Sequence, residues 1–381
     1  MTVPASRVRP RPAGRVLPLL LVVALLAPLG VLFQQAWRLT DDDRSLAERE
    51  RLGVEYLRAL APVTDALVQA QSAAVAGRPA SGAALTDAVA EAAAVDARIG
   101  RDLRSQERWA GVRAKLEALG GRAPTDPEAA FTAYAEVTDL LLDLHRKVRE
   151  SSGLVRDPES DSFYLQDAAG RQLPEAMVAA GRLTDLATLA AGRPSAEQPR
   201  TVADLAALRV AALTPAGALV DDLRAAVDNS ESTDLGGTVL TPLDTYQRAV
   251  EALAAASAPS RTGVADPGPL AGARLNAHAA AEQLQPVILA ELDALLAARV
   301  DRLERDRRLT AAGGALGVLL LLTLGGVLAA AGRRRARAVR PEPAAPENGA
   351  WPVASEPRPL QPAGRGGDPE AARWGPADAA R

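Results

Sequence analysis

The chain has 381 residues and a formal net charge of -3 at pH 7; 48% of the residues are hydrophobic, 3% are aromatic and none is cysteine. The lack of cysteine excludes disulfides, thiolate chemistry and cysteine-ligated metal sites, so stability must come from packing. The small net charge gives no general basic field, and we therefore expect no nucleic-acid partner.

Residues 1–15 are basic, and residues 16–37 form the first of two apolar spans. A helix needs about 20 apolar residues to cross a bilayer, so we expect a transmembrane helix over 16–37, with Phe33 and Trp37 at its outer interface. A cleaved signal peptide is the alternative, disfavoured because Pro28 follows the small residues near which cleavage would occur. The basic residues before the span are Arg7, Arg9, Arg11 and Arg15.

Residues 309–332 form the second apolar span, and five arginines follow it within eight residues: Arg333, Arg334, Arg335, Arg337 and Arg340. By the positive-inside rule both termini are cytoplasmic, residues 38–308 lie outside the cytoplasmic (inner) membrane, and anionic lipid is the expected neighbour of the arginines. Gly313 and Gly317 have the small-xxx-small spacing of associating membrane helices, which favours a homodimer.

Apolar residues in the outer segment recur with a helical period. We expect the first outer helix to run from Arg38 to about Ala76, directly out of the first span. A seven-residue spacing along it resembles a coiled-coil seam, formed by Leu39, Leu46, Leu60 and Leu67 with Tyr56 and Val63 adjoining. At 1.5 Å per residue this helix would reach roughly 60 Å from the membrane.

Apolar residues at steps of three and four over 85–119 predict one long second helix. Asp126 and Pro127 then provide a cap and a first helical residue for a third. The expected buried face of the third helix consists of Phe131, Tyr134, Thr138, Leu141, His145 and Val148.

Further helices are expected over 160–191, 200–230, 238–256 and 270–308, and the last should continue into the second span. Prolines inside three of them should bend or shorten the helices: Pro215, Pro242 and Pro286. No alternating pattern predicts a sheet. The predicted fold class is therefore all-α: an elongated, extracytoplasmic up-and-down bundle of about six or seven long helices between two transmembrane helices.

Residues 333–381 are rich in proline, glycine, alanine and charge, a composition that cannot bury a core. We expect a disordered cytoplasmic tail. Trp351 and Trp374 are interpreted as exposed aromatics, with short docking elements as the alternative.

Residues 151–173, SSGLVRDPESDSFYLQDAAGRQL, are the most distinctive stretch. Asp157 caps a helix that starts at Pro158, and Asp161, Tyr164 and Asp167 recur at three-residue spacing on one side beyond it. One interpretation is a helix restart with solvated acids. The other is a polar pocket in which Arg156 and Arg171 hold an anion and Tyr164 offers its ring face and hydroxyl. The candidate ligand-binding residues are Arg156, Asp157, Asp161, Tyr164, Asp167 and Arg171.

This stretch resembles a signature in the extracytoplasmic helical region of bacterial chemoreceptors (methyl-accepting chemotaxis proteins) and related sensor histidine kinases. The matching residues are Asp157-Pro158, Asp161-Ser162, Phe163-Tyr164-Leu165, Asp167 and Leu173-Pro174. The segments 50–57 and 102–109 are also similar. Two departures stand out. Residues 69–77 lack the His and Arg of the family's Gln-x-His-Arg-Gly element, and no HAMP linker, methylated coiled coil or kinase core follows Arg340.

The resemblance implies a membrane-anchored sensor module that binds a small ligand and, having no expected output domain, signals in trans through a separate histidine kinase or chemoreceptor. Two alternatives remain open. One is a structural or scaffold two-span envelope protein without a small ligand; the other is a degenerate receptor with no present activity.

No HExxH, nucleophile elbow or P-loop is present, so we expect neither an enzyme nor a cofactor. His145 lies near Asp143, and His278 is one turn before Glu282. Each pair is short of ligands, so we expect no metal site. The acidic run 41–43 is interpreted as solvated, because adjacent helical residues do not converge on one point.

Overall fold

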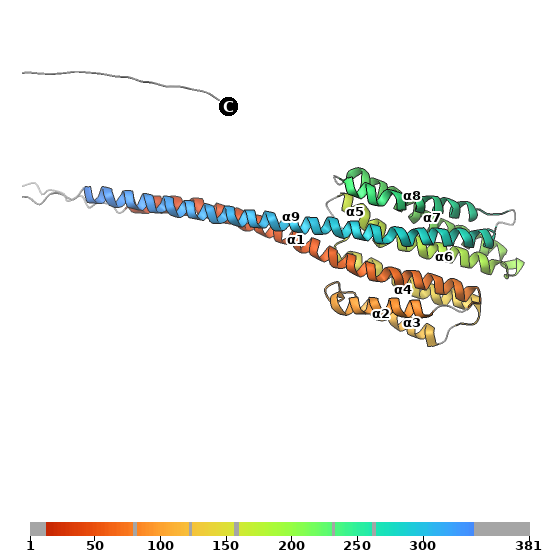
Figure 1. Cartoon of the computed structure of the whole chain (residues 1–381). Coiled ribbons are helices and arrows are strands. Elements are labelled where there is room, and N and C mark those ends of the chain that lie inside the picture. The colour runs from red at the N-terminus through yellow and green to blue at the C-terminus, as the bar shows by residue number, and fades with distance from the viewer. Residues whose placement is uncertain are drawn as a thin grey trace, which may run out of the picture. The chain divides into compact units, whose positions relative to one another are not determined.

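The computed structural model describes residues 13–78, 82–121, 124–155, 160–230, 233–260 and 264–338. Within these ranges the chain is helical and has no β-strand, which confirms the all-α fold class (Figure 1). The expected tail beyond residue 338 and the basic residues before residue 13 lie outside the described part. The chain divides into two compact units, Met1–Gly326 and Val327–Arg381, and the features below belong to the first.

The helices in chain order are α1 (Ala13–Val75), α2 (Gly82–Ile99), α3 (Gln106–Gly121), α4 (Pro127–Ser152), α5 (Ser160–Asp167), the π-helical turn η1 (Ala168–Gln172), α6 (Leu173–Ala190), the 3-10 turn η2 (Ser195–Glu197), α7 (Gln198–Asn229), α8 (Thr233–Ala256) and α9 (Pro267–Ala338). If α5, η1 and α6 are counted as one segment, the described residues contain eight long helical segments, slightly more than expected.

The prediction of one long helix over 85–119 is wrong, because this segment forms two helices, α2 and α3, and this accounts for the extra helix. The chain breaks after α2 and restarts at α3. The Asp96 side chain occupies the space beside Gly100 and accepts a hydrogen bond from the Ser105 hydroxyl at 3.1 Å. Arg104 adopts a left-handed φ of 50°. Apolar residues on both sides of the break remain buried, so their spacing indicated burial without revealing the turn.

Helix α4 begins as its sequence predicts. The Asp126 carboxylate accepts a hydrogen bond from the Ala129 N–H at 2.9 Å, and Pro127 is the first helical residue. The helix ends at Gly153, whose φ of 98° is left-handed. Five of the six residues on the expected face are buried: Tyr134, Thr138, Leu141, His145 and Val148.

The internal prolines do not end their helices. Helices α7, α8 and α9 continue through Pro215, Pro242 and Pro286 respectively, so none of them is shortened at its proline; the expected bending of some of them stays a prediction.

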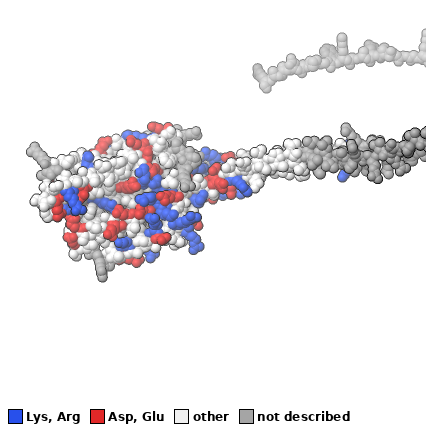
Figure 2. All heavy atoms as spheres, turned by 180° about the vertical axis from the view of Figure 1, so that it is seen from behind, with Lys and Arg blue, Asp and Glu red and all other residues white. Residues whose placement is uncertain are grey.

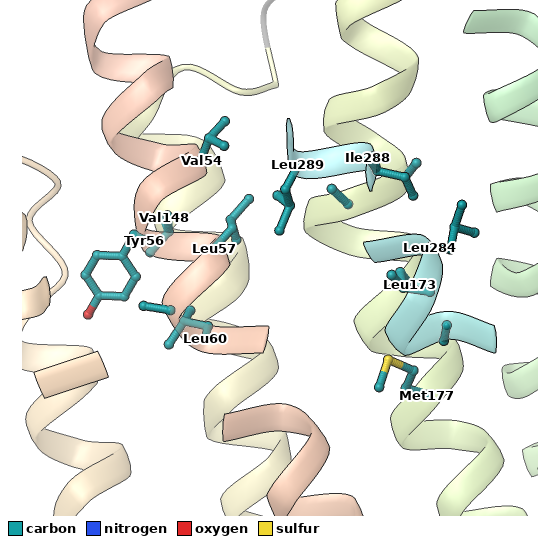
Figure 3. Close-up of a cluster of buried hydrophobic side chains, with 14 of the residues drawn as sticks. Val54, Tyr56, Leu57, Leu60, Val148, Leu173, Met177, Leu284, Ile288 and Leu289 are labelled. Carbon is teal, nitrogen blue, oxygen red and sulfur yellow. The ribbon is translucent and has the colours of Figure 1, made fainter. Parts of the chain in front are cut away.

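The main core surrounds the outer half of α1, which contacts α2, α4 and α6. Tyr56, Leu60, Val63 and Leu67 are fully buried, as their spacing predicts, whereas Leu39 is 60% exposed. In Figure 3 the side chains of α1, α4, α6 and α9 form one apolar cluster, so the first and last helices of the chain share a core.

Two helices in the described part are long and apolar enough to cross a membrane, α7 with η2 (Ser195–Asn229) and α9 (Pro267–Ala331). Helix α7 contributes Leu219, Leu223 and Ala226 to the main core and thus belongs to the bundle. The most apolar stretch of α9 contains no buried residue. Figure 2 shows acidic and basic side chains intermingled on one face of the bundle and an uncharged segment extending from it.

Helix α1, which contains the predicted first span, is not one of these two helices among the described residues. The span is helical and its described apolar side chains are exposed; Val31 and Leu32 are 62% and 65% accessible. A Cβ added at Gly314 of α9 would come within 2.6 Å of the Phe33 ring, so a glycine is needed there for close approach. A Cβ added at Gly317 would lie 3.8 Å from the Leu29 Cδ2, which is ordinary van der Waals contact. Gly313 faces open space. Gly314 and Gly317 therefore lie against α1 of the same chain, whereas Gly313 does not.

Candidate functional site

The structure describes the side chains of only three of the six predicted ligand-binding residues. Arg156 and Asp157 lie outside the described residues, and Asp161 belongs to α5 with its side chain outside the description. Tyr164, Asp167 and Arg171 are described. The structure therefore informs us about the C-terminal half of the predicted pocket.

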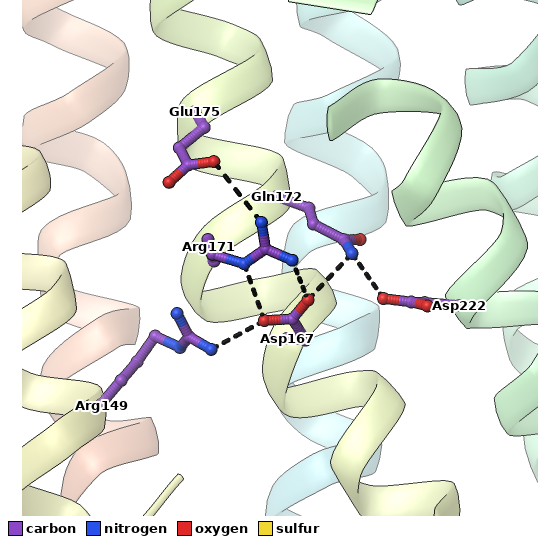
Figure 4. Close-up of polar contacts among 6 residues, drawn as sticks. All are labelled: Arg149, Asp167, Arg171, Gln172, Glu175 and Asp222. Carbon is purple, nitrogen blue, oxygen red and sulfur yellow. Dashed lines mark hydrogen bonds and ion pairs between the residues drawn. The ribbon is translucent and has the colours of Figure 1, made fainter. Parts of the chain in front are cut away.

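Asp167 is the centre of a polar cluster where α5 passes through the π-helical turn into α6 (Figure 4). Its carboxylate accepts hydrogen bonds from Arg149 at 2.7 Å, from Arg171 at 2.5 and 2.9 Å, and from the Gln172 amide at 2.9 Å. The Gln172 amide also donates to Asp222 of α7 at 2.5 Å. The Asp167 carboxylate thus joins α4 to the π-helical turn, and Gln172 extends the cluster to α7.

The charges in this cluster already compensate one another. Burial alone would raise the pKa of Asp167, but the hydrogen bond from Arg171 and the charge of Arg149 outweigh burial and lower it. The hydrogen bond to Asp167 raises the pKa of Arg171, and Glu175 lies 3.9 Å from the same guanidinium. A ligand anion at Arg171 would have to compete with two carboxylates of the chain.

The Arg149 side chain packs against the backbone of the π-helical turn at Gly170. A Cβ at Gly170 would lie 2.5 Å from the Arg149 Cδ, so the absence of a side chain there lets the guanidinium reach Asp167. π-Helical turns are often found at functional sites. Here the turn orients Asp167 and Gln172 toward neighbouring helices.

The aromatic pair of the motif is divided between core and surface. Tyr164 is half-buried and packs against the main core, while Phe163 is 42% exposed; their rings meet edge to face at 5.8 Å. Ser162 is buried, and its hydroxyl accepts a hydrogen bond from Arg299 of α9 at 3.1 Å. Arg299 also pairs with Glu50 of α1 at 3.3 Å. The Asp-Ser motif therefore joins α5 to both α1 and α9.

A cavity of about 600 Å³ lies between α1, the start of α2 and α9, away from the predicted pocket. Helix α9 contributes one polar face, Arg274, His278 and Glu282, at four-residue spacing. Helix α1 contributes Gln69 and small residues opposite. The complete lining is Ala66, Gln69, Ala70, Ser72, Ala73, Arg78, Ala84, Arg274, Leu275, His278, Ala279 and Glu282.

Arg274 is the unusual residue of this cavity. Its side chain is only 7% exposed, yet neither Nε nor Nη1 has a hydrogen-bond partner among the described residues. Burial lowers its pKa, partly opposed by the negative charges of Asp185 and Asp65. Buried guanidinium donors without hydrogen bonds are costly, and an anionic group beside Arg274 would offset part of that cost.

Sequence reasoning missed this site. The signal available was Arg274, His278 and Glu282 on one helical face, but α1 and α9 are separated by some two hundred residues. No local pattern shows that they face each other.

Polar contacts continue between α1 and α9 from the bundle toward the apolar segments. They are Arg51–Asp293 at 2.9 Å, Glu50–Arg299 at 3.3 Å, Arg44–Glu304 at 3.2 Å and Asp41–Arg307 at 3.6 Å. The Arg307 guanidinium also lies 4.5 Å from the centre of the Trp37 ring. These contacts fix the register of the two helices where each meets its apolar segment.

No family model, no curated protein and no solved structure matches the chain.

Proposed function

We propose that the chain is a membrane-anchored extracytoplasmic sensor module, resembling the input half of a chemoreceptor, that binds a small anionic ligand between α1 and α9. In this proposal the bundle is an up-and-down arrangement between two spans, with both termini cytoplasmic. The observation that carries the proposal is the buried Arg274, whose Nε and Nη1 have no hydrogen-bond partner among the described residues, in a cavity lined by the two helices that lead into the apolar segments.

The proposed signal is a displacement of α9 relative to α1. A carboxylate that pairs with Arg274 adds an attractive contact to one face of α9, which is helical from the cavity to its apolar segment. Helix shifts of about 1–2 Å are typical of such transitions. In this proposal the shift acts on a separate histidine kinase or chemoreceptor.

The cluster around Asp167 has a different role in this proposal. Its two described arginines are already paired, so we assign it to bracing α4, α6 and α7 and not to ligand binding.

The binding test uses thermal unfolding of the full chain in non-ionic detergent, screened against the standard amino acids and short aliphatic dicarboxylates at millimolar concentration. We expect a subset to raise the midpoint for the wild type and to lose this effect in Arg274→Gln. The matched control is Arg171→Gln at the motif. If Arg171→Gln alone abolishes the effect, the ligand binds at the motif. If both variants keep it, neither site is correct.

The partner test uses a C-terminal affinity tag and mild solubilisation of native membranes. Co-purification of a histidine kinase or chemoreceptor supports signalling in trans. Reproducible recovery of envelope proteins, together with no stabilising ligand in the screen, favours the scaffold alternative.

A further inference from the structure

Three side chains with metal-ligating atoms meet between α1 and α9. Asp65 comes from α1, and His278 and Glu282 come from one face of α9, one helical turn apart. One ligand atom from each lies within 4.8 Å of the other two. The His278 Nε2 contacts the Asp65 carboxylate directly and lies 3.9 Å from the Glu282 Oε1.

Asp65 supplies the third ligand that the pair His278 and Glu282 lacked in the sequence. His278 and Glu282 alone were too few for a metal site, and Asp65 is 213 residues away from His278. Folding brings an imidazole nitrogen and two carboxylate oxygens together. Three protein ligands of these types, with a remaining position for water, suit a first-row divalent ion such as Zn²⁺.

A neighbouring amide orients one of the carboxylates. Gln69, one turn beyond Asp65 on α1, donates hydrogen bonds to both carboxylate oxygens, at 3.1 and 3.0 Å. Such hydrogen bonds to ligating groups commonly fix their orientation in metal sites.

The cluster is accessible from two sides. Glu282 lines both the 600 Å³ cavity and a second cavity of about 330 Å³, and Asp65 lines the second. His278 is 7% exposed, whereas the Asp65 and Glu282 side chains are 23% and 46% exposed. An ion can therefore enter from solvent, and water can complete its coordination.

We propose that Asp65, His278 and Glu282 bind one first-row divalent metal ion, which links α1 to α9 beside the cavity. This inference goes beyond the proposed function, because the ion is a second ligand at a different set of atoms from Arg274. Its test needs neither the anionic ligand nor the signalling partner.

The test measures Zn²⁺ binding to the full chain in non-ionic detergent. The protein carries an affinity peptide without histidine and is stripped with a chelator and dialysed beforehand. Titration calorimetry and competition with a chromophoric chelator give stoichiometry and affinity. We expect one saturable site per chain. Glu282→Gln and Asp65→Asn should each weaken binding at least about tenfold, and Gln69→Ala by about tenfold.

Two variants serve as matched controls. Glu291→Gln removes another α9 carboxylate, one that accepts a hydrogen bond from Thr238. His145→Gln removes the only other histidine. Both should bind Zn²⁺ like the wild type. Glu282→Gln is the decisive variant, because its side chain is half-exposed and the substitution preserves its shape, so the fold should survive; metal-free thermal unfolding checks this.

Three results would overturn the proposal: no saturable binding by the wild type, equal affinity for wild type and Glu282→Gln, or the same loss in Glu291→Gln. The first would leave the His278–Asp65 contact as an ordinary hydrogen bond. The other two would mean that Zn²⁺ binds exposed acids elsewhere.

Discussion

Removing the Arg299 guanidinium should destabilise the bundle strongly. Arg299 of α9 pairs with Glu50 of α1 and donates to Ser162 of α5, and the side chains of Arg299 and Glu50 are 9% and 0% exposed. Arg299→Met keeps most of the side-chain volume and removes the charge. The Glu50 carboxylate then stays buried and loses its ion pair with Arg299.

The expected cost is about 3–5 kcal/mol, the usual range for breaking a buried ion pair on one side. The matched control is Arg51→Met. Arg51 pairs with Asp293 across the same two helices at 2.9 Å, but the two side chains are 43% and 33% exposed. An exposed pair contributes roughly 0–1 kcal/mol. The two variants thus differ mainly in burial.

The assay is equilibrium unfolding of the full chain in detergent, followed by the helical circular dichroism signal. The double variant Glu50→Leu/Arg299→Met completes a mutant cycle. It should recover most of the lost stability, because both charges of the buried pair are then removed together. Equal costs for Arg299→Met and Arg51→Met, or a double variant as unstable as Arg299→Met, would refute this reasoning.

Three further predictions concern other parts of the bundle and the apolar segments. Burial lowers the pKa of His145 to about 4 from 6.5, so the folded chain binds fewer protons than the unfolded chain; stability should fall by about 3 kcal/mol as pH falls from about 6.5 to 4. His145→Gln should flatten that slope in pH-dependent unfolding, and an unchanged slope would exclude His145 as its source. Gly170→Ala should cost about 1–3 kcal/mol in unfolding experiments by displacing Arg149, whereas Gly217→Ala, with open space around it, should stabilise by up to about 1 kcal/mol. Gly314→Ile should slow disulfide formation between cysteines placed at Arg44 and Glu304, because the new side chain would push α9 away from Phe33; Gly313→Ile should not, and equal rates for both would contradict the packing.

The sequence predicted those parts of the fold that depend on local chemistry. The cap at Asp126 and the buried spacing of Leu60 and Leu67 follow from neighbours along one helix. The break after α2 could not be predicted in this way. The Asp96 side chain stabilises the turn, but the apolar residues on both sides of the turn keep a helical period.

The site was harder to predict than the helices. The motif around Asp167 was recognisable from its residues, but their partners Arg149 and Asp222 come from other helices. Arg274 shares one helical face with His278 and Glu282, but its burial depends on how α9 packs, which that spacing does not reveal. Periodicity identifies the buried face of a helix without identifying the helix that covers it.

The polar contacts between α1 and α9 also constrain the length of the chain between bundle and apolar segments. Each residue added to an α-helix advances it by about 1.5 Å and turns everything beyond it by about 100°. A single insertion between Arg299 and Arg307 would therefore keep Glu50 paired while turning Arg307 away from Asp41 and Trp37. About seven residues restore the rotational phase. Seven residues in α9 alone would still move Arg307 about 10 Å along the axis, past Asp41 and Trp37. Natural variation in length should therefore occur in near-heptad steps that α1 and α9 share.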